Sequence, residues 1–401
     1  MNYEKVRKLL WVILGVTLII GLISFVFRVM GGLATTDLGS YVPWGLFIAG
    51  DIYFISMSAG AFLISSLVYV FGVKTLEPVG PLALFTALIC LLASMLHVIF
   101  DLGRIERFWY MIASPNLGSL LNYIVWAYMV YSLLMIAELF LAIRGRLWVK
   151  AKRVYTPDME AKDKRIVKIL AILGIPLAIS FHGGVGAMFG VLIARPYWHG
   201  GVYPILFLIA ALAAGGAFMT FIIAFFNSKK GESSNLLRFI ARLSLGILIF
   251  ENLYLLAEYF LVLYQGAPHD VQAVMWVFTG PYSWAFWSIQ LILGTLVPII
   301  ILSHPRLIRK TTWVGMAGLL IVIGFFVTRL NIILPALATS TSENEAFLSA
   351  FDGVRLTLSY IPTLTEWGVV IGAISLAAIL FLIGYERLPL IDKTHTEVAD
   401  R

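Results

Sequence analysis

Residues 81–102 read PLALFTALICLLASMLHVIFDL, and His97 and Asp101 are the only ionisable side chains in this run besides one cysteine. A helix of roughly 20 apolar residues is long enough to cross the hydrocarbon core of a bilayer. Similar runs, separated by short polar breaks, lie near 9–29, 42–72, 119–143, 166–194, 202–226, 236–264, 282–303, 312–334 and 362–385. The sequence therefore predicts an all-α integral membrane protein with ten transmembrane helices.

Composition excludes a soluble protein of this length. Of the 401 residues, 60% are hydrophobic and 13% are charged, whereas an average soluble domain is about 25% charged. A soluble chain this apolar would expose large hydrophobic patches. In a membrane protein a net charge of +7 reflects how the lysines and arginines are placed on the two sides of the membrane. We therefore expect the chain to lie in a lipid bilayer and not to bind nucleic acid.

The lysines and arginines are distributed unequally between the two sides of the ten spans. All but six of the 29 fall on the side of the N-terminus, and the six on the opposite side are Arg28, Arg104, Arg107, Arg195, Arg329 and Arg355. Cytoplasmic loops carry the excess of Lys and Arg in membrane proteins. We therefore predict a multi-pass protein of the cell (cytoplasmic) membrane with both termini in the cytoplasm.

A weak internal duplication indicates how the spans are grouped. The stretch at 43–62 is similar to the stretch at 204–218, and each contains small residues that permit close helix packing. We predict one membrane domain, 1–401, built from two four-helix bundles. They comprise helices 2–5 (residues 42–194) and helices 6–9 (residues 202–334), flanked by helix 1 (9–29) and helix 10 (362–385).

Ionisable residues within a bilayer are costly, so each is a candidate for function. His97, Asp101 and Arg104 follow one another at i, i+4 and i+7, which predicts a single stripe at the outer end of the third span. The alternative is that Asp101 and Arg104 only pair with each other and that His97 is a core histidine.

Aromatic and polar residues are predicted to surround this stripe. They are Tyr41 and Trp44 before the second span, and Asn122, Tyr123 and Trp126 at the start of the fourth. Ser114 is a candidate cap for that fourth helix, with Pro115 in its first turn. An aromatic, lipid-accessible pocket beside a His/Asp pair suits a quinone, whose ring stacks and whose protons His97 and Asp101 can transfer. Interfacial aromatic belts are the competing explanation.

Other acids and a histidine lie at several depths of the predicted bilayer. They are Asp51, Glu138, His182, Glu251 and Glu258. Such a set can form a proton path, or the same groups can be paired structural charges. The sequence leaves these alternatives open.

Two other functions compete with quinone chemistry. A b-type haem anchor needs facing histidines, and His97 and His182 are the only intramembrane pair. A secondary transporter typically has helices broken near the midplane, for which Pro176 and Pro298 are candidates. The single cysteine, Cys90, excludes an intramolecular disulfide and a Cys-ligated iron–sulfur cluster. We expect no haem and no metal centre in this chain.

At these residues the sequence resembles the NrfD family, the membrane subunits of polysulfide reductase and related respiratory complexes. The matching stretches include PWGLFIAGDIYFISMSAGAF at 43–62, the Asp-Leu-Gly-Arg to Ser-Pro segment at 101–115, and FTGPYSWAFW at 278–287. The family often has Arg-Pro where this chain has Arg104 followed by Ile105. Ten spans resemble the longer branch of the family, and within it most closely DsrP of the DsrMKJOP complex of sulfate and sulfite reducers.

The resemblance implies a quinone-interacting subunit of a respiratory oxidoreductase, with menaquinone bound in the first bundle near the outer face. It also implies a partner, an iron–sulfur (ferredoxin-like) subunit on the periplasmic side, and a link to sulfite or sulfate reduction. Carried over residue by residue, the site falls on Trp44, His97, Asp101, Arg104, Tyr123 and Asn122. Glu251, Glu258 and His182 match the family less clearly.

Overall fold

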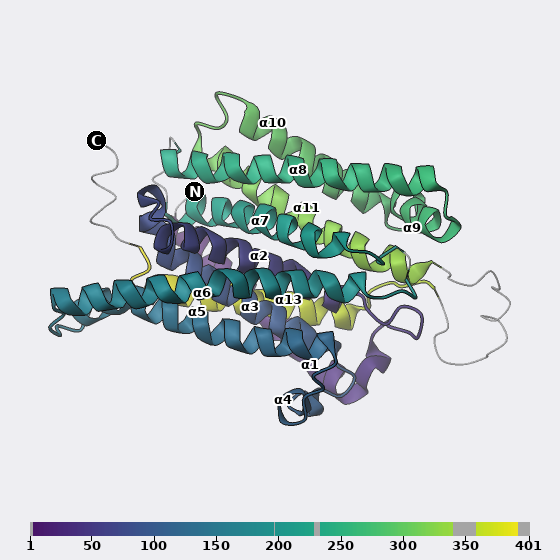
Figure 1. The fold of residues 1–401 in the computed structure, drawn as a ribbon, viewed down its shortest axis with the longest axis horizontal. Coiled ribbons are helices and arrows are strands. Elements are labelled where there is room, and N and C mark those ends of the chain that lie inside the picture. The colour runs from purple at the N-terminus through teal and green to yellow at the C-terminus, as the bar shows by residue number, and fades with distance from the viewer. Residues whose placement is uncertain (1–2, 196, 228–232, 340–357, 392–401) are drawn as a thin grey trace.

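The computed structural model describes residues 3–195, 197–227, 233–339 and 358–391. Its regular elements are helices, and ten of them within these ranges are long and apolar enough to cross a membrane. They run side by side along the long axis of the molecule (Figure 1). The prediction of an all-α, ten-helix membrane protein is confirmed.

The spanning elements follow the predicted order. They are α1 (Tyr3–Gly31), α2 (Leu46–Tyr69), α3 (Gly80–Asp101), α5 (Leu120–Lys150), α6 (Pro157–Gly190), α7 (Val202–Ile222), α8 (Asn235–Gln265), the π-helical η5 (Ala285–Leu296) continued by α10 (Val297–Ser303), α11 (Thr311–Ala338) and α13 (Leu364–Arg387). Shorter elements connect them: η1 (Gly32–Thr35), η2 (Lys74–Val79), η3 (Ile105–Arg107), α4 (Tyr110–Ala113), the π-helical η4 (Ile223–Asn227) and α9 (Pro268–Thr279).

Helix α2 is the most enclosed element and lies at the centre of the molecule. It packs against α3, α6, α7 and α11, while α1 packs against α13 at the periphery. Gly60 of α2 and Gly215 of α7 allow two backbones to meet, because a Cβ on Gly60 would lie 2.3 Å from the carbonyl oxygen of Ala211. The grouping into two four-helix bundles stays a prediction.

The first and last spans meet at their ends. Arg7 in α1 forms an ion pair with Glu386 in α13, 2.8 Å apart. The two ends of the described chain therefore lie on one side of the helix stack, as an even number of spans requires. Which side of the membrane this is stays a prediction.

Helices α5 and α6 are longer than the sequence predicted. They contain 31 and 34 residues, or roughly 45–50 Å at 1.5 Å per residue, against a hydrocarbon core of about 30 Å. Their excess length forms a hairpin beyond the other helices, at the left of Figure 1. Thr156 caps the start of α6 by accepting a hydrogen bond from the Met159 amide, 3.3 Å away.

Candidate functional site

We call the end of the molecule opposite the Arg7–Glu386 ion pair its outer end. At that end of α3 the backbone differs from the continuous helical stripe that the sequence predicted. The helix stops at Asp101, and Leu102 is extended (φ −63°, ψ 129°). Arg104 therefore lies outside the helix and is exposed, so it does not share a face with His97 and Asp101 as the i, i+7 spacing predicted. Gly103, which follows Leu102, belongs to the same break in the helix.

His97 is fully enclosed between α3 and α2. Its Nδ1 lies 2.7 Å from the carbonyl oxygen of Ala93, so in the neutral ring Nδ1 carries the proton and Nε2 presents a lone pair. Nε2 finds no hydrogen-bond partner in the described part of the chain. Gly50 makes room for the ring, because a Cβ there would lie 2.3 Å from His97 Cδ2.

A buried polar network lies next to His97, and two of its members were not predicted from the sequence. Asp51 of α2 accepts hydrogen bonds on Oδ1 from Ser94 Oγ of α3 and from the Tyr128 hydroxyl of α5, the latter at 2.6 Å. The hydroxyl oxygens of Ser94 and Tyr128 are 2.5 Å apart. Ser94 stands three residues before His97, a spacing that indicates a shared helix face.

Arg28 of α1 is a third residue of this region that was not predicted from the sequence. It is 1% exposed, and its Nη2 donates to the carbonyl oxygen of Leu102 over 2.9 Å, at the C-terminus of α3. Asp101 lies within electrostatic range of this guanidinium. Arg28 Nε and Asp101 Oδ1 are both buried, and neither has a hydrogen-bond partner among the residues described. We call Arg28, Asp51, Ser94, His97, Asp101 and Tyr128 the outer cluster.

The predicted aromatic wall is divided between two places. The Trp44 ring lies 5.8 Å from those of Phe189 and Trp198, at the outer end of α6. Near it, Arg195 Nη2 donates to the carbonyl oxygen of Tyr41 over 3.2 Å. Trp44 and Tyr41 thus contact the α6–α7 connection.

The residues at the start of α5 form the second part of that wall. Tyr123 and Trp126 are exposed, and the Tyr123 hydroxyl bonds to Ser180 of α6. Asn122 is buried. The cap of this helix is Ser119, whose hydroxyl accepts from the Asn122 amide at 3.4 Å, so the predicted cap at Ser114 is wrong. Ser114 instead follows α4.

A second polar group lies where α2, α6 and α11 meet. Arg329 of α11 is completely buried, donates from Nη2 to Ser56 Oγ over 2.9 Å, and has a second partner in the Phe207 ring face at 5.0 Å. Glu251 of α8 is buried within electrostatic range of Arg329. His182 of α6 has Nε2 2.8 Å from the carbonyl oxygen of Ile55. We call Ser56, His182, Glu251 and Arg329 the central cluster.

The geometry of His182 bears on the haem alternative. Its Nδ1 lies 2.8 Å from the carbonyl oxygen of Ala178, so both ring nitrogens face backbone oxygens and neither is free to bind iron. In the described ranges, no group of three or more His, Cys, Asp or Glu side chains is arranged to hold a metal ion.

The remaining predicted acids are separate from both clusters. Glu138 of α5 is buried, and neither of its carboxyl oxygens has a partner within the described chain. Glu258 of α8 is half-buried within electrostatic range of Asp270 in α9, a pair of like charges. The structure does not join the five predicted proton-path residues into one continuous hydrogen-bonded chain within its described parts.

A further buried acid, Glu366 of α13, was also missed. It completes a capping box with Thr363 and accepts a hydrogen bond from the Tyr360 hydroxyl at 2.5 Å. Tyr360 in turn accepts from the Leu46 amide, 2.8 Å away, at the start of α2. Threonine three residues before glutamate is the sequence pattern that identifies this cap. Glu366 therefore joins the outer ends of α2 and α13.

Comparison with known proteins shows the family to which the chain belongs. The chain is 34% identical to the C subunit of selenate reductase from Mesobacillus selenatarsenatis, over 96% of this chain and 95% of that protein. It is 28% identical to the Hdr-like menaquinol oxidoreductase integral membrane subunit of Archaeoglobus fulgidus, over 96% and 94%. It is also 28% identical to the menaquinone reductase integral membrane subunit of Nitratidesulfovibrio vulgaris, over 91% and 87%. The family model described as polysulphide reductase, NrfD, matches residues 35–341, and the chain belongs to the NrfD family.

Proposed function

We propose that this chain is the quinone-reactive membrane subunit of a respiratory oxidoreductase, and that the outer cluster is its menaquinone or menaquinol site. Two similar proteins carry menaquinol or menaquinone in their names, which supports a quinone as the ligand. The observation that carries the proposal is the pair of buried atoms without partners, His97 Nε2 and Asp101 Oδ1, one helical turn apart near the outer end of α3.

These atoms fit the chemistry of a quinone. In the reduced form its two hydroxyl groups donate hydrogen bonds, so a quinol hydroxyl can pair with an acceptor such as Asp101 Oδ1. A bound menaquinol supplies two electrons and two protons, and menaquinone takes up the same number. The positive charge of Arg28 near Asp101 favours an anionic ligand or carboxylate at this position.

Each residue of the outer cluster has a distinct part in the proposal. Asp101 is partly exposed and is the member that meets the ligand, together with the exposed Arg104 and the aromatic residues at the start of α5. His97 is enclosed one turn deeper, with the Nε2 lone pair ready to take a proton. In the same region the hydroxyls of Ser94 and Tyr128 donate hydrogen bonds to Asp51 Oδ1, and this carboxylate is the proposed final acceptor of the proton.

We extend the proposal to the partner and the substrate. Electrons pass between the quinone and an iron–sulfur subunit on the periplasmic side, and the N- and C-termini lie in the cytoplasm. The family resemblance supports sulfite or sulfate as the final substrate, and the similar selenate reductase protein makes selenate a second candidate. Proton translocation through the central cluster is proposed on the basis of the buried Arg329 and Glu251. Comparing quinol-linked reduction of selenate, sulfite and polysulfide by the purified complex separates the candidate substrates.

The test of the site uses His97→Ala and Asp101→Asn, each in the assembled complex. Removing a positioned proton acceptor typically costs a factor of about 10²–10⁴ in rate, so both should lower quinol-linked electron transfer by at least the smaller factor. His199→Ala and Glu106→Gln change exposed residues on the outer side and serve as controls. If His97→Ala and Asp101→Asn assemble normally and keep full electron transfer, the site assignment is wrong.

A further inference from the structure

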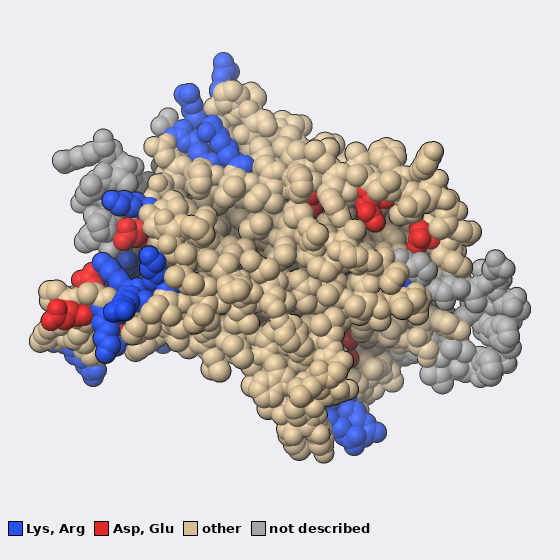
Figure 2. Space-filling view, in the orientation of Figure 1, with Lys and Arg blue, Asp and Glu red and all other residues tan. Residues whose placement is uncertain are grey.

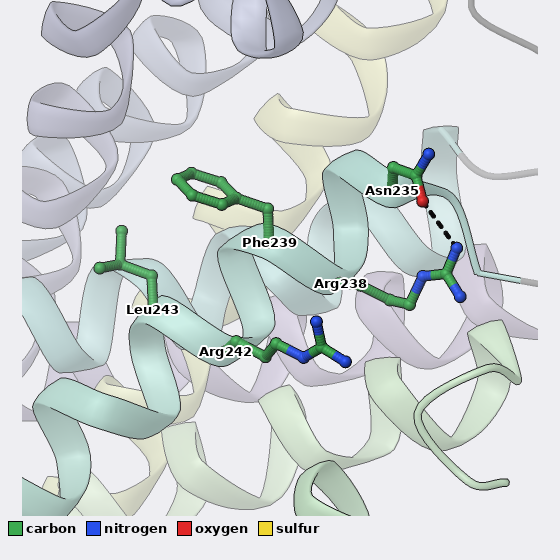
Figure 3. Close-up of a pocket in the computed structure, with 5 residues that line it drawn as sticks. All are labelled: Asn235, Arg238, Phe239, Arg242 and Leu243. Carbon is green, nitrogen blue, oxygen red and sulfur yellow. Dashed lines mark hydrogen bonds between the residues drawn. The ribbon is translucent and has the colours of Figure 1, made fainter. Parts of the chain in front are cut away.

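The N-terminal part of α8 carries an open pocket whose lining residues belong to neither cluster. The pocket has a volume of about 500 Å³ and is lined by Asn235, Arg238, Phe239, Arg242 and Leu243. All five residues come from the first turns of one helix (Figure 3). None of them is acidic, so the pocket combines two cations with two apolar side chains.

The arginines place two like charges on one face of the helix. Arg238 and Arg242 are four residues apart, a spacing at which like charges destabilise a helix. Arg238 Nη2 donates a hydrogen bond to Asn235 Oδ1, 2.7 Å away. The asparagine side chain is neutral, so it does not compensate the charge of Arg238. Figure 3 shows both guanidinium groups turned to the same side of α8, with Phe239 and Leu243 on another side. An anion between the guanidinium groups would remove the repulsion.

Further positive charge gathers at the same end of the molecule. The amide and the hydroxyl of Ser233 donate to the carbonyl oxygens of Arg309 and Ile308, both over 2.6 Å. These bonds tie the start of α8 to the α10–α11 connection, which carries the exposed Arg306, Arg309 and Lys310. Lysine and arginine atoms without acidic atoms among them cover this corner in Figure 2, at its upper left. The N-terminus of α8 adds the partial positive charge of a helix dipole.

The depth and the apolar surface of the pocket identify what kind of anion it suits. Arg242 lies about 10 Å along the helix from Asn235, so on a helix of 31 residues both arginines fall near one membrane interface. Phe239 is 48% exposed and Leu243 is 41% exposed. The exposed apolar surface continues along α8 through Phe250, Leu253, Leu256 and Phe260. A free phosphate would use the arginines and leave this surface unexplained, whereas a lipid uses both.

We propose that this pocket binds the phosphodiester headgroup of an anionic phospholipid in the leaflet at the α8 N-terminus, with its acyl chains along α8. The planar guanidinium groups of Arg238 and Arg242 donate paired hydrogen bonds to phosphate oxygens. Basic pockets at the ends of transmembrane helices are suited to anionic lipids by charge, and each arginine near the headgroup strengthens binding by a factor of about five.

The test uses the purified complex, with phosphatidylglycerol as the probe and native mass spectrometry and thermal unfolding as the readouts. The wild type should retain phosphatidylglycerol and gain thermal stability when it is added, and phosphatidylcholine should have a much smaller effect. In Arg238→Gln/Arg242→Gln, binding should weaken about 25-fold, the product of a factor of about five for each arginine. Arg153→Gln/Arg165→Gln removes two exposed arginines at the α5–α6 hairpin and should bind like the wild type.

The outcomes decide the proposal. Equal phosphatidylglycerol binding by the wild type and the Arg238/Arg242 double variant would overturn it. So would stabilisation by inorganic phosphate alone that matches that of the lipid, because the ligand would then be a free anion. Loss of another subunit from the double variant with unchanged lipid binding would identify a protein contact and also overturn it. If the double variant does not assemble, the exposed Arg242→Gln alone gives the same readouts, with about five-fold weaker lipid binding expected.

Discussion

The position of His97 depends on Gly50, which faces it across the contact between α2 and α3. A glycine inside a helix ordinarily costs roughly 0.5–1 kcal/mol relative to alanine, so this one has a packing reason. A Cβ at residue 50 would lie 2.7 Å from His97 Nε2, the atom proposed to take a proton. The imidazole and the glycine therefore form one structural unit.

Replacing Gly50 tests that unit. Gly50→Ala should push the His97 ring away, lower stability by about 1–3 kcal/mol through overpacking, and reduce quinol-linked turnover. Thermal unfolding and turnover measure the two effects. Gly183→Ala in α6 is the matched control, because a Cβ there meets nothing within 4 Å, and it should be neutral or slightly stabilising. An active Gly50→Ala protein of unchanged stability would contradict the packing argument.

Arg28 is the residue through which α1 reaches the outer cluster. Arg28→Met keeps much of the apolar volume and removes the bond to the Leu102 carbonyl oxygen, 2.9 Å long. A hydrogen bond involving a charged group contributes about 1.5–3 kcal/mol, so we expect a loss of that size and reduced turnover. Denaturation and quinol-linked activity assays measure both. Arg107→Met, at an exposed position on the same side, should change neither; a similar loss in both variants would rule out a specific role for Arg28.

At the scale of elements, the α5–α6 hairpin is held together by Asp163. Its carboxylate accepts two hydrogen bonds from Arg144, at 2.5 and 2.7 Å, and one from the Tyr155 hydroxyl at 2.8 Å. Burial and the bond to Asp163 raise the pKa of Tyr155 to about 12, so this hydroxyl remains a donor at physiological pH. The connection between α5 and α6 is therefore held by several hydrogen bonds.

Asp163→Asn should destabilise the hairpin. The pair is largely buried, with side chains 20% and 4% exposed for Arg144 and Asp163, so its loss should cost about 1–3 kcal/mol. The Glu160–Lys164 pair on the same helix is 50% and 72% exposed, and Glu160→Gln should cost less than about 1 kcal/mol. Protease sensitivity of the 150–157 connection and thermal unfolding should distinguish the Asp163→Asn variant from the Glu160→Gln variant. Equal effects would mean that burial does not set the strength of the Asp163 pair.

The number and order of the helices could be predicted from the sequence because apolar runs and the positions of cations are one-dimensional signals. The end of α3 could not, since the break after Asp101 depends on local backbone geometry that a regular i, i+4, i+7 spacing does not contain. Ser94 and Tyr128 lie in apolar runs, and only the packing of α2, α3 and α5 reveals that they meet Asp51. Arg28 was counted as an outer cation, and its burial depends on α3 and α13.

At the scale of the whole molecule, most lysines and arginines lie at the opposite end from the outer cluster. Lysines and arginines gather at the end where α1 begins, including the hairpin and the start of α8 (Figure 2). The outer cluster lies towards the other end, where α1 ends and α3 ends. The positive-inside rule predicts that the basic end is cytoplasmic. With that orientation, the proposed quinone site is predicted to face the periplasm.

Cysteine labelling tests this orientation. In a Cys90→Ser background, Glu106→Cys should react with a membrane-impermeant maleimide in intact cells. Lys162→Cys should react only after permeabilisation, because the predicted topology places the start of α6 in the cytoplasm. The unmodified protein, whose only cysteine is buried, should stay unlabelled. The reverse pattern would invert the topology and place the outer cluster on the cytoplasmic side.

The contact between Gly60 and Gly215 constrains how the protein can work. Where two backbones touch directly, no layer of side chains is available to slide or to rearrange, and α2 and α7 move together. Helix α2 also carries Asp51 of the outer cluster and Ser56 of the central cluster. Both clusters therefore include a residue of the same tightly packed helix. Rocking of one half against the other, the usual motion of a secondary transporter, would have to separate this seam. A mechanism in which the two clusters act together on a nearly fixed scaffold is therefore favoured over one in which the two halves of the protein rock against each other.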